Sequence, residues 1–258
     1  MQPTSTKNPF LQSIRRAVTS GRTLEDGCVV IEGPHLVGEL LHTAWRLQQV
    51  LVTPAGRDRH AHLLSKTRTE ITEVPSRAFE ALSGTETSQE IMALAVPPQY
   101  SWNDCLGKPG IAVVLDNIQD PGNAGTIFRS AEAFGASSVI FLEGSVRLAN
   151  GKFLRATAGS IFRLPYLEAQ NRPALLANLR ATNRTLFALT AKAQLSVSQA
   201  NLSGPAAIVV GSEAHGVSPE LLACAKGLRI PTSHVESLNA GVACSIALFE
   251  AARQRGNA

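Results

Sequence analysis

The sequence predicts an α/β protein built from two successive α/β segments. Short β-rich runs alternate with helical patterns twice along the 258-residue chain, which is typical of sheets covered by helices. Hydrophobic residues make up 44% of the sequence and charged residues 17%, which supplies a core and excludes global disorder. No apolar run approaches the ~20 residues needed to span a bilayer, so we expect no membrane partner.

The first segment contains four β-rich runs separated by helical stretches. They are CVVIEG (28–33), QQVLVT (48–53), EITEVP (70–75) and IMALAV (91–96). A Pro- and Gly-rich stretch with neither helical nor strand periodicity follows and marks a boundary. We therefore expect a first domain over residues 1–96, a linker over 97–110 and a second domain over 111–258.

The second segment begins with a buried-strand pattern and alternates strands with helices again. Its predicted strands are IAVVLD (111–116), SVIFLE (138–143), TLFALT (185–190), AAIVVG (206–211) and LRI (228–230). Its predicted helices cover 123–134, 173–182 and 239–254. This order favours a second, mostly parallel α/β domain.

Charge is distributed unevenly along the chain. Residues 1–107 carry a net charge of −1 and residues 108–258 a net charge of +5. Within 147–184 seven basic residues accompany a single acidic one, Glu168. Clustered basic residues favour a polyanionic partner, most simply a nucleic acid, with an ordinary solvated surface as the alternative.

The cysteines and the N-terminus indicate a compartment. Four cysteines lie far apart with no C-x-x-C pair, which fits neither a disulfide framework nor a zinc site and suits a reducing cytoplasm. Residues 1–20 have no continuous apolar region, so we expect a first helix there and no secretory signal. No spacing of histidine, cysteine or carboxylate residues indicates a metal site.

Several common catalytic motifs are absent. The sequence has no G-x-G-x-x-G dinucleotide fingerprint and no G-x-S-x-G elbow. Gly211 and Gly216 have the spacing of a phosphate loop, but Val217 and Ser218 stand where that loop has Lys and Ser or Thr. A nucleoside-triphosphatase is therefore excluded.

Three polar clusters each follow a predicted strand of the second segment. The first, LDNIQDPGNAGTIFRSAEAFG (115–135), contains a Pro-Gly-Asn turn, with Asn123 expected to cap the next helix and Arg129 expected on its second turn. The others are VGSEAHGVS (210–218) and IPTSHVESLNAGVA (230–243). Each alone has a structural interpretation as caps, turns or surface charge, but three in succession favour a functional site.

Together these clusters resemble the signature motifs of the SpoU (TrmH-like) RNA 2′-O-methyltransferases of the SPOUT superfamily. The resemblance covers residues 108–258, where N-x-G-x-x-x-R, G-x-E-x-x-G and I-P…S-L-N occur in that order. The first segment resembles, less specifically, the substrate-binding domain of rRNA-modifying members. One departure is that Ala240 and Gly241 follow S-L-N where the family has Val and Ser; both are small and we expect them to be tolerated.

The resemblance implies a fold, a cofactor and an assembly. The second domain would contain a deep trefoil knot, an exception to the rule against threaded connections, and the first would have the fold of a small ribosomal RNA-binding protein. Backbone groups near Gly211, Ile230 and Leu238, with Thr190 close by, would hold the adenosine of S-adenosylmethionine. Family members are homodimers with the active site at the subunit interface, so a homodimer through the second domain is expected.

The implied reaction moves a methyl group from a sulfonium to a ribose 2′-oxygen. Holding the reactants at near-attack distance lowers the barrier by up to ~7–11 kcal/mol, and removing or polarising the hydroxyl proton contributes the rest. Arg129 is the family's candidate for removing or polarising that proton. Because a guanidinium does not readily lose a proton, we expect Arg129 instead to position a phosphate and stabilise the developing alkoxide. Asn123 and Ser237 would contact that phosphate or the ribose. Glu213 would hold Arg129 or loop backbone, and Asn239 would orient the third loop and cap the last helix.

The sequence thus predicts an S-adenosylmethionine-dependent RNA 2′-O-methyltransferase acting on large-subunit (23S) rRNA. A tRNA methyltransferase is the first alternative, disfavoured because tRNA members often carry short basic helical extensions in place of a near-neutral α/β domain. A catalytically silent RNA-binding protein of the same fold and a chemically identical antibiotic-resistance methyltransferase also stay open. The target nucleotide is not indicated.

Overall fold

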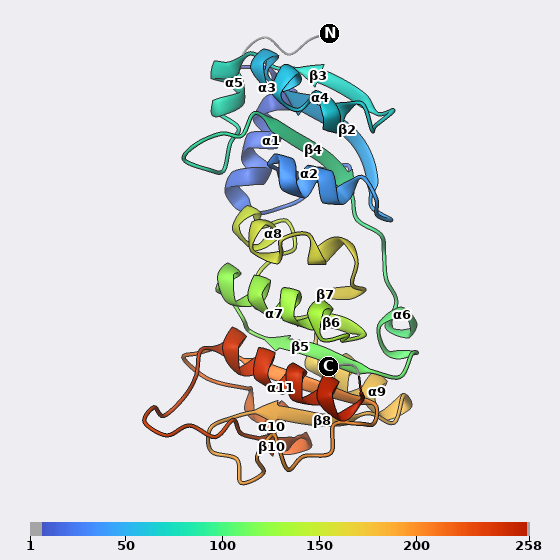
Figure 1. The fold of residues 1–258 in the computed structure, drawn as a ribbon, viewed down its shortest axis with the longest axis vertical. Helices are drawn as coiled ribbons and strands as arrows, with labels where there is room; N and C mark the ends of the chain where they lie inside the picture. The colour runs from blue at the N-terminus through green and yellow to red at the C-terminus, as the bar shows by residue number, and fades with distance from the viewer. Residues whose placement is uncertain (1–6, 257–258) are drawn as a thin grey trace. The chain divides into compact units, whose positions relative to one another are not determined.

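A computed structural model describes residues 7–256, which divide into two compact units (Figure 1). One unit contains the chain up to Gln99 together with Arg147–Arg163. The other contains Tyr100–Val146 and the chain from Leu164 onward. The division at residue 99 lies within the expected linker, whereas residues 147–163, expected in the second domain, group with the first unit. Of residues 1–20, where a first helix is expected, positions 1–6 lie outside the described residues.

The first unit is built on a four-stranded mixed sheet of order β1-β4-β2-β3. Its strands are β1 (Val29–Glu32), β2 (Arg46–Val52), β3 (Glu70–Glu73) and β4 (Ile91–Val96). β4 pairs antiparallel with β1 and β2, and β2 pairs parallel with β3. All four strands coincide with the β-rich runs seen in the sequence, except that β2 begins two residues earlier. β1 and β4 are almost entirely buried and apolar, whereas β3 buries only Thr72.

Five short helices accompany this sheet. They are α1 (Pro9–Ser20), α2 (Pro34–Leu40), α3 (Pro54–Arg59), α4 (Ala61–Leu64) and α5 (Ser76–Glu80). α1 begins where the Asn8 side chain accepts hydrogen bonds from the N–H groups of Phe10 and Leu11. It ends at Gly21, whose φ of 61° is the left-handed conformation that commonly closes a helix.

Residues 147–163 pack into the first unit although they follow the second strand of the other sheet in sequence. They form α8 (Gly151–Thr157) and a 3₁₀ turn, η1 (Ser160–Phe162). The Phe162 ring meets the Trp45 ring edge-on at a centroid distance of 5.1 Å, and Arg163 pairs with Glu39. Phe162, which is 2% exposed, is therefore buried against Trp45 of the first unit.

The second unit contains a six-stranded sheet of order β10-β8-β9-β5-β6-β7, in which every pair is parallel. The strands are β5 (Ile111–Asp116), β6 (Ser138–Leu142), β7 (Tyr166–Gln170), β8 (Thr185–Leu189), β9 (Ala206–Gly211) and β10 (Lys226–Leu228). β10 begins two residues before the run expected at 228–230. β7 was not predicted, because this edge strand exposes Glu168 and carries Ala169 at a φ of 52°, which breaks the alternation that marks a strand.

Helices cover both faces of this sheet (Figure 1). They are α6 (Trp102–Leu106), α7 (Pro121–Ala133), α9 (Arg172–Ala181), α10 (Pro219–Cys224) and α11 (Ala240–Gln254). α6, α9 and α10 share one core with Ala112, Val114 and Ile140. α7 places Phe128 against Phe141, with ring centroids 5.6 Å apart, and successive strand residues face opposite sides, so α7 covers the other face.

The mostly parallel α/β architecture predicted from the sequence is confirmed. α6 lies within the expected linker and begins with a capping box between Ser101 and Asp104, a local signal that hydrophobic periodicity does not detect. Across residues 7–256, no helix has the length and apolar character needed to cross a membrane. The trefoil knot implied by the resemblance stays a prediction.

Candidate functional site

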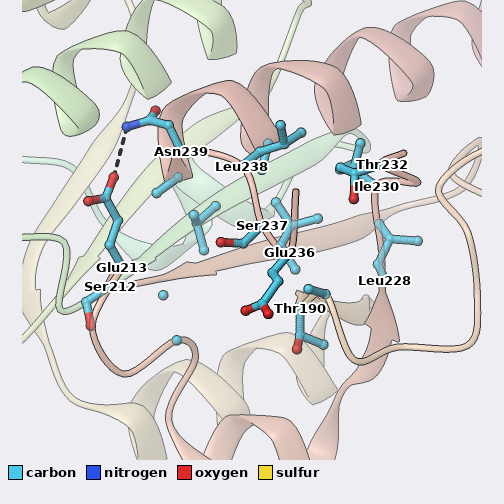
Figure 2. Close-up of a pocket in the computed structure, with 17 residues that line it drawn as sticks. Thr190, Ser212, Glu213, Leu228, Ile230, Thr232, Glu236, Ser237, Leu238 and Asn239 are labelled. Atoms are coloured by element: carbon cyan, nitrogen blue, oxygen red, sulfur yellow. Dashed lines mark hydrogen bonds between the residues drawn. The ribbon is translucent and has the colours of Figure 1, made fainter. Parts of the chain in front are cut away.

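A pocket lies at the carboxyl ends of β8, β9 and β10 (Figure 2). Parallel strands bring their carboxyl ends to one edge of the sheet, which is where open α/β sheets bind ligands. The pocket has a volume of about 440 Å³, within the range of small-molecule sites. The loops that follow β9 and β10, which carry the second and third polar clusters, form much of its wall.

Three side chains from the three polar clusters form one hydrogen-bonded group beside this pocket. Asn239 donates through Nδ2 to Asn123 Oδ1 at 2.7 Å and to Glu213 Oε1 at 2.9 Å. Asn123 donates through its own Nδ2 to Glu213 Oε1 at 3.0 Å. Figure 2 shows the contact between Asn239 and Glu213 at the pocket rim. We call this group the amide–carboxylate cluster; it joins three of the residues selected from the sequence.

The two asparagines occupy different positions on their helices. Asn239 caps α11 by accepting from the Val242 N–H at 3.2 Å, as expected. Asn123 does not cap α7, because that helix begins earlier, at Pro121, and the cap is Asp120, which accepts from the Asn123 N–H at 2.7 Å. An acidic residue followed by proline is itself a helix-start signal, so the sequence contained the information that assigns this cap.

The loop after β9 is shaped by two glycines. A Cβ atom at Gly211 would overlap the backbone of Gly216 and Val217, so a side chain cannot be accommodated there without displacing the loop. Gly216 has a φ of 68° and donates its N–H to the Ser212 carbonyl at 2.7 Å. The resulting tight turn holds Glu213 at its tip, beside the two asparagines.

A buried ion pair fixes the far end of the same loop. Asp116, 1% exposed at the end of β5, accepts from Arg172 Nη2 at 2.7 Å and from the Ser218 N–H at 2.7 Å. Arg172 also donates through Nε to Ser218 Oγ at 2.9 Å. Sequence reasoning missed this contact. An acidic residue closing a buried strand was the available signal for Asp116, whereas nothing in the sequence pattern singled out Arg172.

All four residues expected at the adenosine line the pocket: Thr190, Gly211, Ile230 and Leu238. Much of the remaining wall is apolar side chain or backbone. Among the described residues that line it, Glu213 and Glu236 are charged and none is Lys, Arg or His. Such a wall suits an uncharged or cationic ligand and does not suit a polyphosphate, because nothing there would neutralise the phosphate charge.

Ser237 and Arg129 lie in different surroundings. Ser237 is exposed and lines the pocket. Arg129 is exposed on α7, does not line the pocket, and forms no hydrogen bond or ion pair with another residue in the range 7–256. The expected pairing of Glu213 with Arg129 is therefore not formed in the described part of the chain, where Glu213 accepts from two amides instead.

Most of the basic cluster at 147–184 serves structural contacts. Arg172 pairs with Asp116, Arg163 with Glu39, and Arg155 lies 4.0 Å from Glu32. Arg184 is buried, and its guanidinium donates to the carbonyls of Leu106, Lys108, Gly110 and Ala206; burial lowers the pKa of this group.

Three basic residues of that range remain exposed without an ion pair to any described residue: Arg147, Lys152 and Arg180. The sequence cluster therefore overstates the basic surface that this range offers to a polyanion.

The departure at Ala240 and Gly241 lies where two helices meet. A Cβ atom at Gly241 would lie 3.2 Å from two side-chain carbons of Thr126 on α7. Ser130 Oγ and Ser245 Oγ, 2.6 Å apart, join the same two helices one turn further along. Gly241 thus permits a close approach of α7 and α11, which carry Asn123 and Asn239 to the cluster.

Each of the two parts of the chain matches a known protein-family model. Residues 110–249 match the model described as the SpoU rRNA Methylase family. Residues 13–93 match the model described as an MRM3-like substrate binding domain. Between them, the two matches cover nearly all the strands of both units.

Individual relatives match over nearly their full length. The 23S rRNA (guanosine(2553)-2′-O)-methyltransferase RlmP of Bacillus subtilis is 30% identical over 95% of this chain and 96% of its own. The solved structure of an AdoMet-bound rRNA methyltransferase from Sinorhizobium meliloti has a TM-score of 0.85 at 26% identity, covering 98% of this chain and 97% of that one.

A more distant structure shares the fold. The SpoU methyltransferase AviRb from Streptomyces viridochromogenes, solved with AdoMet, has a TM-score of 0.86 at 23% identity and covers 96% of this chain and 98% of its own.

Proposed function

This chain belongs to the SpoU rRNA methylase family of RNA methyltransferases, and we propose that it methylates a ribose 2′-oxygen of large-subunit ribosomal RNA with S-adenosylmethionine as the donor. The observation that carries the proposal is the amide–carboxylate cluster, in which Asn123, Glu213 and Asn239 meet beside the pocket. One residue comes from each family motif, so the three motifs act as one site.

The pocket fits the proposed cofactor. Its apolar and backbone wall suits an adenine ring, whose edge backbone donors and acceptors can bind, with Gly211, Ile230 and Leu238 as the contact positions and Thr190 nearby. Its two carboxylates suit a ligand with positively charged sulfonium and ammonium groups. When bound, S-adenosylmethionine supplies an electrophilic methyl group attached to a sulfonium.

The protein's own residues then have three tasks. The amide–carboxylate cluster fixes the loops after β5, β9 and the third motif relative to one another, which keeps donor and acceptor at attack distance. Arg129, exposed on α7 and without a partner among the described residues, is available to hold an RNA phosphate and to stabilise charge on the attacking 2′-oxygen. Ser237 at the pocket wall is available to contact the ribose or phosphate.

Ribosomal RNA is favoured over transfer RNA by the first unit. Residues 13–93 match an MRM3-like substrate binding domain, and the relative RlmP, whose name specifies 23S rRNA 2′-O-methylation, aligns over nearly the whole chain. The exposed Arg147, Lys152 and Arg180 are available for phosphate contacts.

We further propose a homodimer through α11 and its neighbour α7. Val242 and Phe249 are 45% and 49% exposed on α11, and the Phe249 ring packs edge-on against Phe134 at the end of α7, 5.7 Å between centroids. Leu248 of the same helix is buried in the core of the unit. All four cysteines are free, in keeping with the cytoplasmic location proposed from the sequence.

Isothermal titration of the full chain with S-adenosylmethionine in EDTA tests the cofactor assignment. The proposal predicts saturable binding without added metal. Absence of heat and of any thermal shift at millimolar cofactor would contradict it. Binding without transfer to any ribosomal RNA would identify a catalytically silent RNA-binding protein.

A further inference from the structure

One of the two carboxylates in the pocket wall is not part of the amide–carboxylate cluster. Glu236 lies in the loop between β10 and α11, and Figure 2 shows its carboxylate turned into the pocket, toward the side lined by Thr190. Glu213, the other carboxylate of the wall, accepts hydrogen bonds from two asparagines. Glu236 has no hydrogen bond or ion pair with the rest of the described chain, so its charge is available to a ligand.

The surroundings of Glu236 strengthen its effect on a charged ligand. Leu228, Ile230 and Leu238 line the same pocket, and no basic side chain among its described lining residues offsets the carboxylate. The Glu236 side chain is exposed, so its attraction for a charged ligand strengthens where that ligand displaces water from the apolar wall.

We propose that Glu236 is the residue by which the pocket distinguishes the methyl-bearing cofactor from its spent product. The inference rests on the proposed function. S-adenosylmethionine carries a sulfonium charge in addition to its ammonium and carboxylate, so its net charge is +1, whereas S-adenosylhomocysteine has a neutral thioether and no net charge. A carboxylate in the pocket therefore favours the donor over the product.

The cofactor loses its sulfonium charge during the transfer, and this loss favours dissociation of the product from the pocket. In the transfer the bond between sulfur and the methyl carbon breaks, and its electron pair stays on sulfur. A bond forms between that carbon and the ribose 2′-oxygen, and the hydroxyl proton passes to solvent water. The sulfur is then neutral, so the attraction of Glu236 for it disappears, and the product dissociates more readily than the donor.

Calorimetry on three full-length proteins tests this role: the unsubstituted chain, Glu236→Gln and the control Glu220→Gln. Glu220 lies exposed on α10 and does not line the pocket, so its substitution removes the same charge elsewhere. The ligands are S-adenosylmethionine, S-adenosylhomocysteine and sinefungin, in which a carbon bearing an amine replaces the methyl sulfonium. Sinefungin therefore retains the positive charge without a transferable methyl group.

Glu236→Gln is expected to weaken S-adenosylmethionine and sinefungin roughly tenfold, because one charge pair in a partly solvated pocket is lost. S-adenosylhomocysteine should change by no more than about twofold, since it lacks the charge involved. Glu220→Gln should bind all three as the unsubstituted protein does.

Equal weakening of all three ligands by Glu236→Gln, or no weakening, would overturn the inference while leaving the proposed function intact. Failure of the unsubstituted protein to bind any of the three would instead overturn the proposed function. If Glu236→Gln does not fold, titration of the unsubstituted protein with the three ligands at low and high salt tests the inference instead. Its preference for the cationic ligands should shrink as salt screens the carboxylate, and a constant preference would overturn the inference.

Discussion

Asn239 donates a hydrogen bond from Nδ2 to Oδ1 of Asn123, 2.7 Å away, across a sequence separation of 116 residues. The same Nδ2 also donates to Glu213, so one amide joins all three family motifs. Asn239 additionally uses its Oδ1 to cap α11. Its two side-chain atoms thus have separable tasks, one for the helix and one for the cluster.

Substitution of Asn239 can separate these tasks. Asp and Ser both cap helices about as well as Asn, so Asn239→Asp and Asn239→Ser should keep the unfolding free energy within about 1 kcal/mol. Both remove the Nδ2 donor of Asn239, and Asp also places a second carboxylate against Glu213. Methyl transfer should therefore fall in both variants and further in Asn239→Asp. Single-turnover methylation and thermal unfolding measure the two effects, and full activity in Asn239→Asp would show that the cluster is not required.

Gly211→Ala should disrupt the loop that presents Glu213. The added Cβ would overlap the backbone of Gly216 and Val217, and overpacking of this kind typically costs about 1–3 kcal/mol. Gly204→Ala is the matched control, because nothing lies within 4 Å of a Cβ at that position. Thermal unfolding and cofactor titration should show a large loss for Gly211→Ala and little change for Gly204→Ala. Equal behaviour of the two variants would contradict the close approach seen here.

Arg129 should be needed for chemistry rather than for general attraction to RNA. If its planar fork holds a phosphate and the reacting oxygen together, Arg129→Lys keeps the charge but loses the geometry. Loss of one well-placed donor at a developing oxyanion typically costs ~10²–10³ in rate, so single-turnover methylation should fall in both Arg129→Lys and Arg129→Ala.

The control for that experiment is Arg180→Ala. Arg180 is exposed on α9 and lies outside the three motifs. Its loss should weaken RNA affinity and the salt dependence of binding, with single-turnover chemistry nearly unchanged. A near wild-type rate for Arg129→Lys would remove Arg129 from the catalytic role.

Removal of the first unit should prevent correct folding of the second part of the chain. A fragment of residues 108–258 keeps the buried apolar side chains of the segment 147–163, among them Phe162, but lacks the rest of the first unit, including Trp45, whose ring packs against Phe162. These apolar side chains would be exposed, so the fragment should bind a hydrophobic dye and aggregate, which light scattering and fluorescence would detect. A soluble fragment that binds no hydrophobic dye and unfolds in a cooperative thermal transition would contradict this prediction. The homodimer is therefore best tested by light scattering of the full chain.

The sequence was informative about strands and motifs for a physical reason. Buried parallel strands are continuous apolar runs, so β5, β6, β8 and β9 could be predicted with accurate positions. The second and third polar clusters follow β9 and β10, and parallel pairing brings the ends of those strands to one edge. The family resemblance, rather than strand pairing, assigned Thr190, Gly211, Ile230 and Leu238 to one site, and all four line the pocket.

Contacts between distant segments could not be predicted in the same way. The pairing of Asp116 with Arg172 and the burial of Arg184 depend on which loops meet, and periodicity carries no information about that. For the same reason the charge count at 147–184 could not separate structural arginines from exposed ones. The packing of residues 147–163 with the first unit is likewise a property of the folded chain, since their sequence does not differ in character from their neighbours.

The most direct test of the proposed function is transfer of labelled methyl from S-adenosylmethionine to total RNA taken from cells that lack this gene, after which the ribosomal and transfer RNAs are separated. After complete digestion to nucleosides, the proposed function predicts label in a single 2′-O-methylnucleoside of the large-subunit RNA, and much less label when Asn239→Asp replaces the unsubstituted protein. Label on a base, label confined to transfer RNA, or no label despite cofactor binding would contradict it.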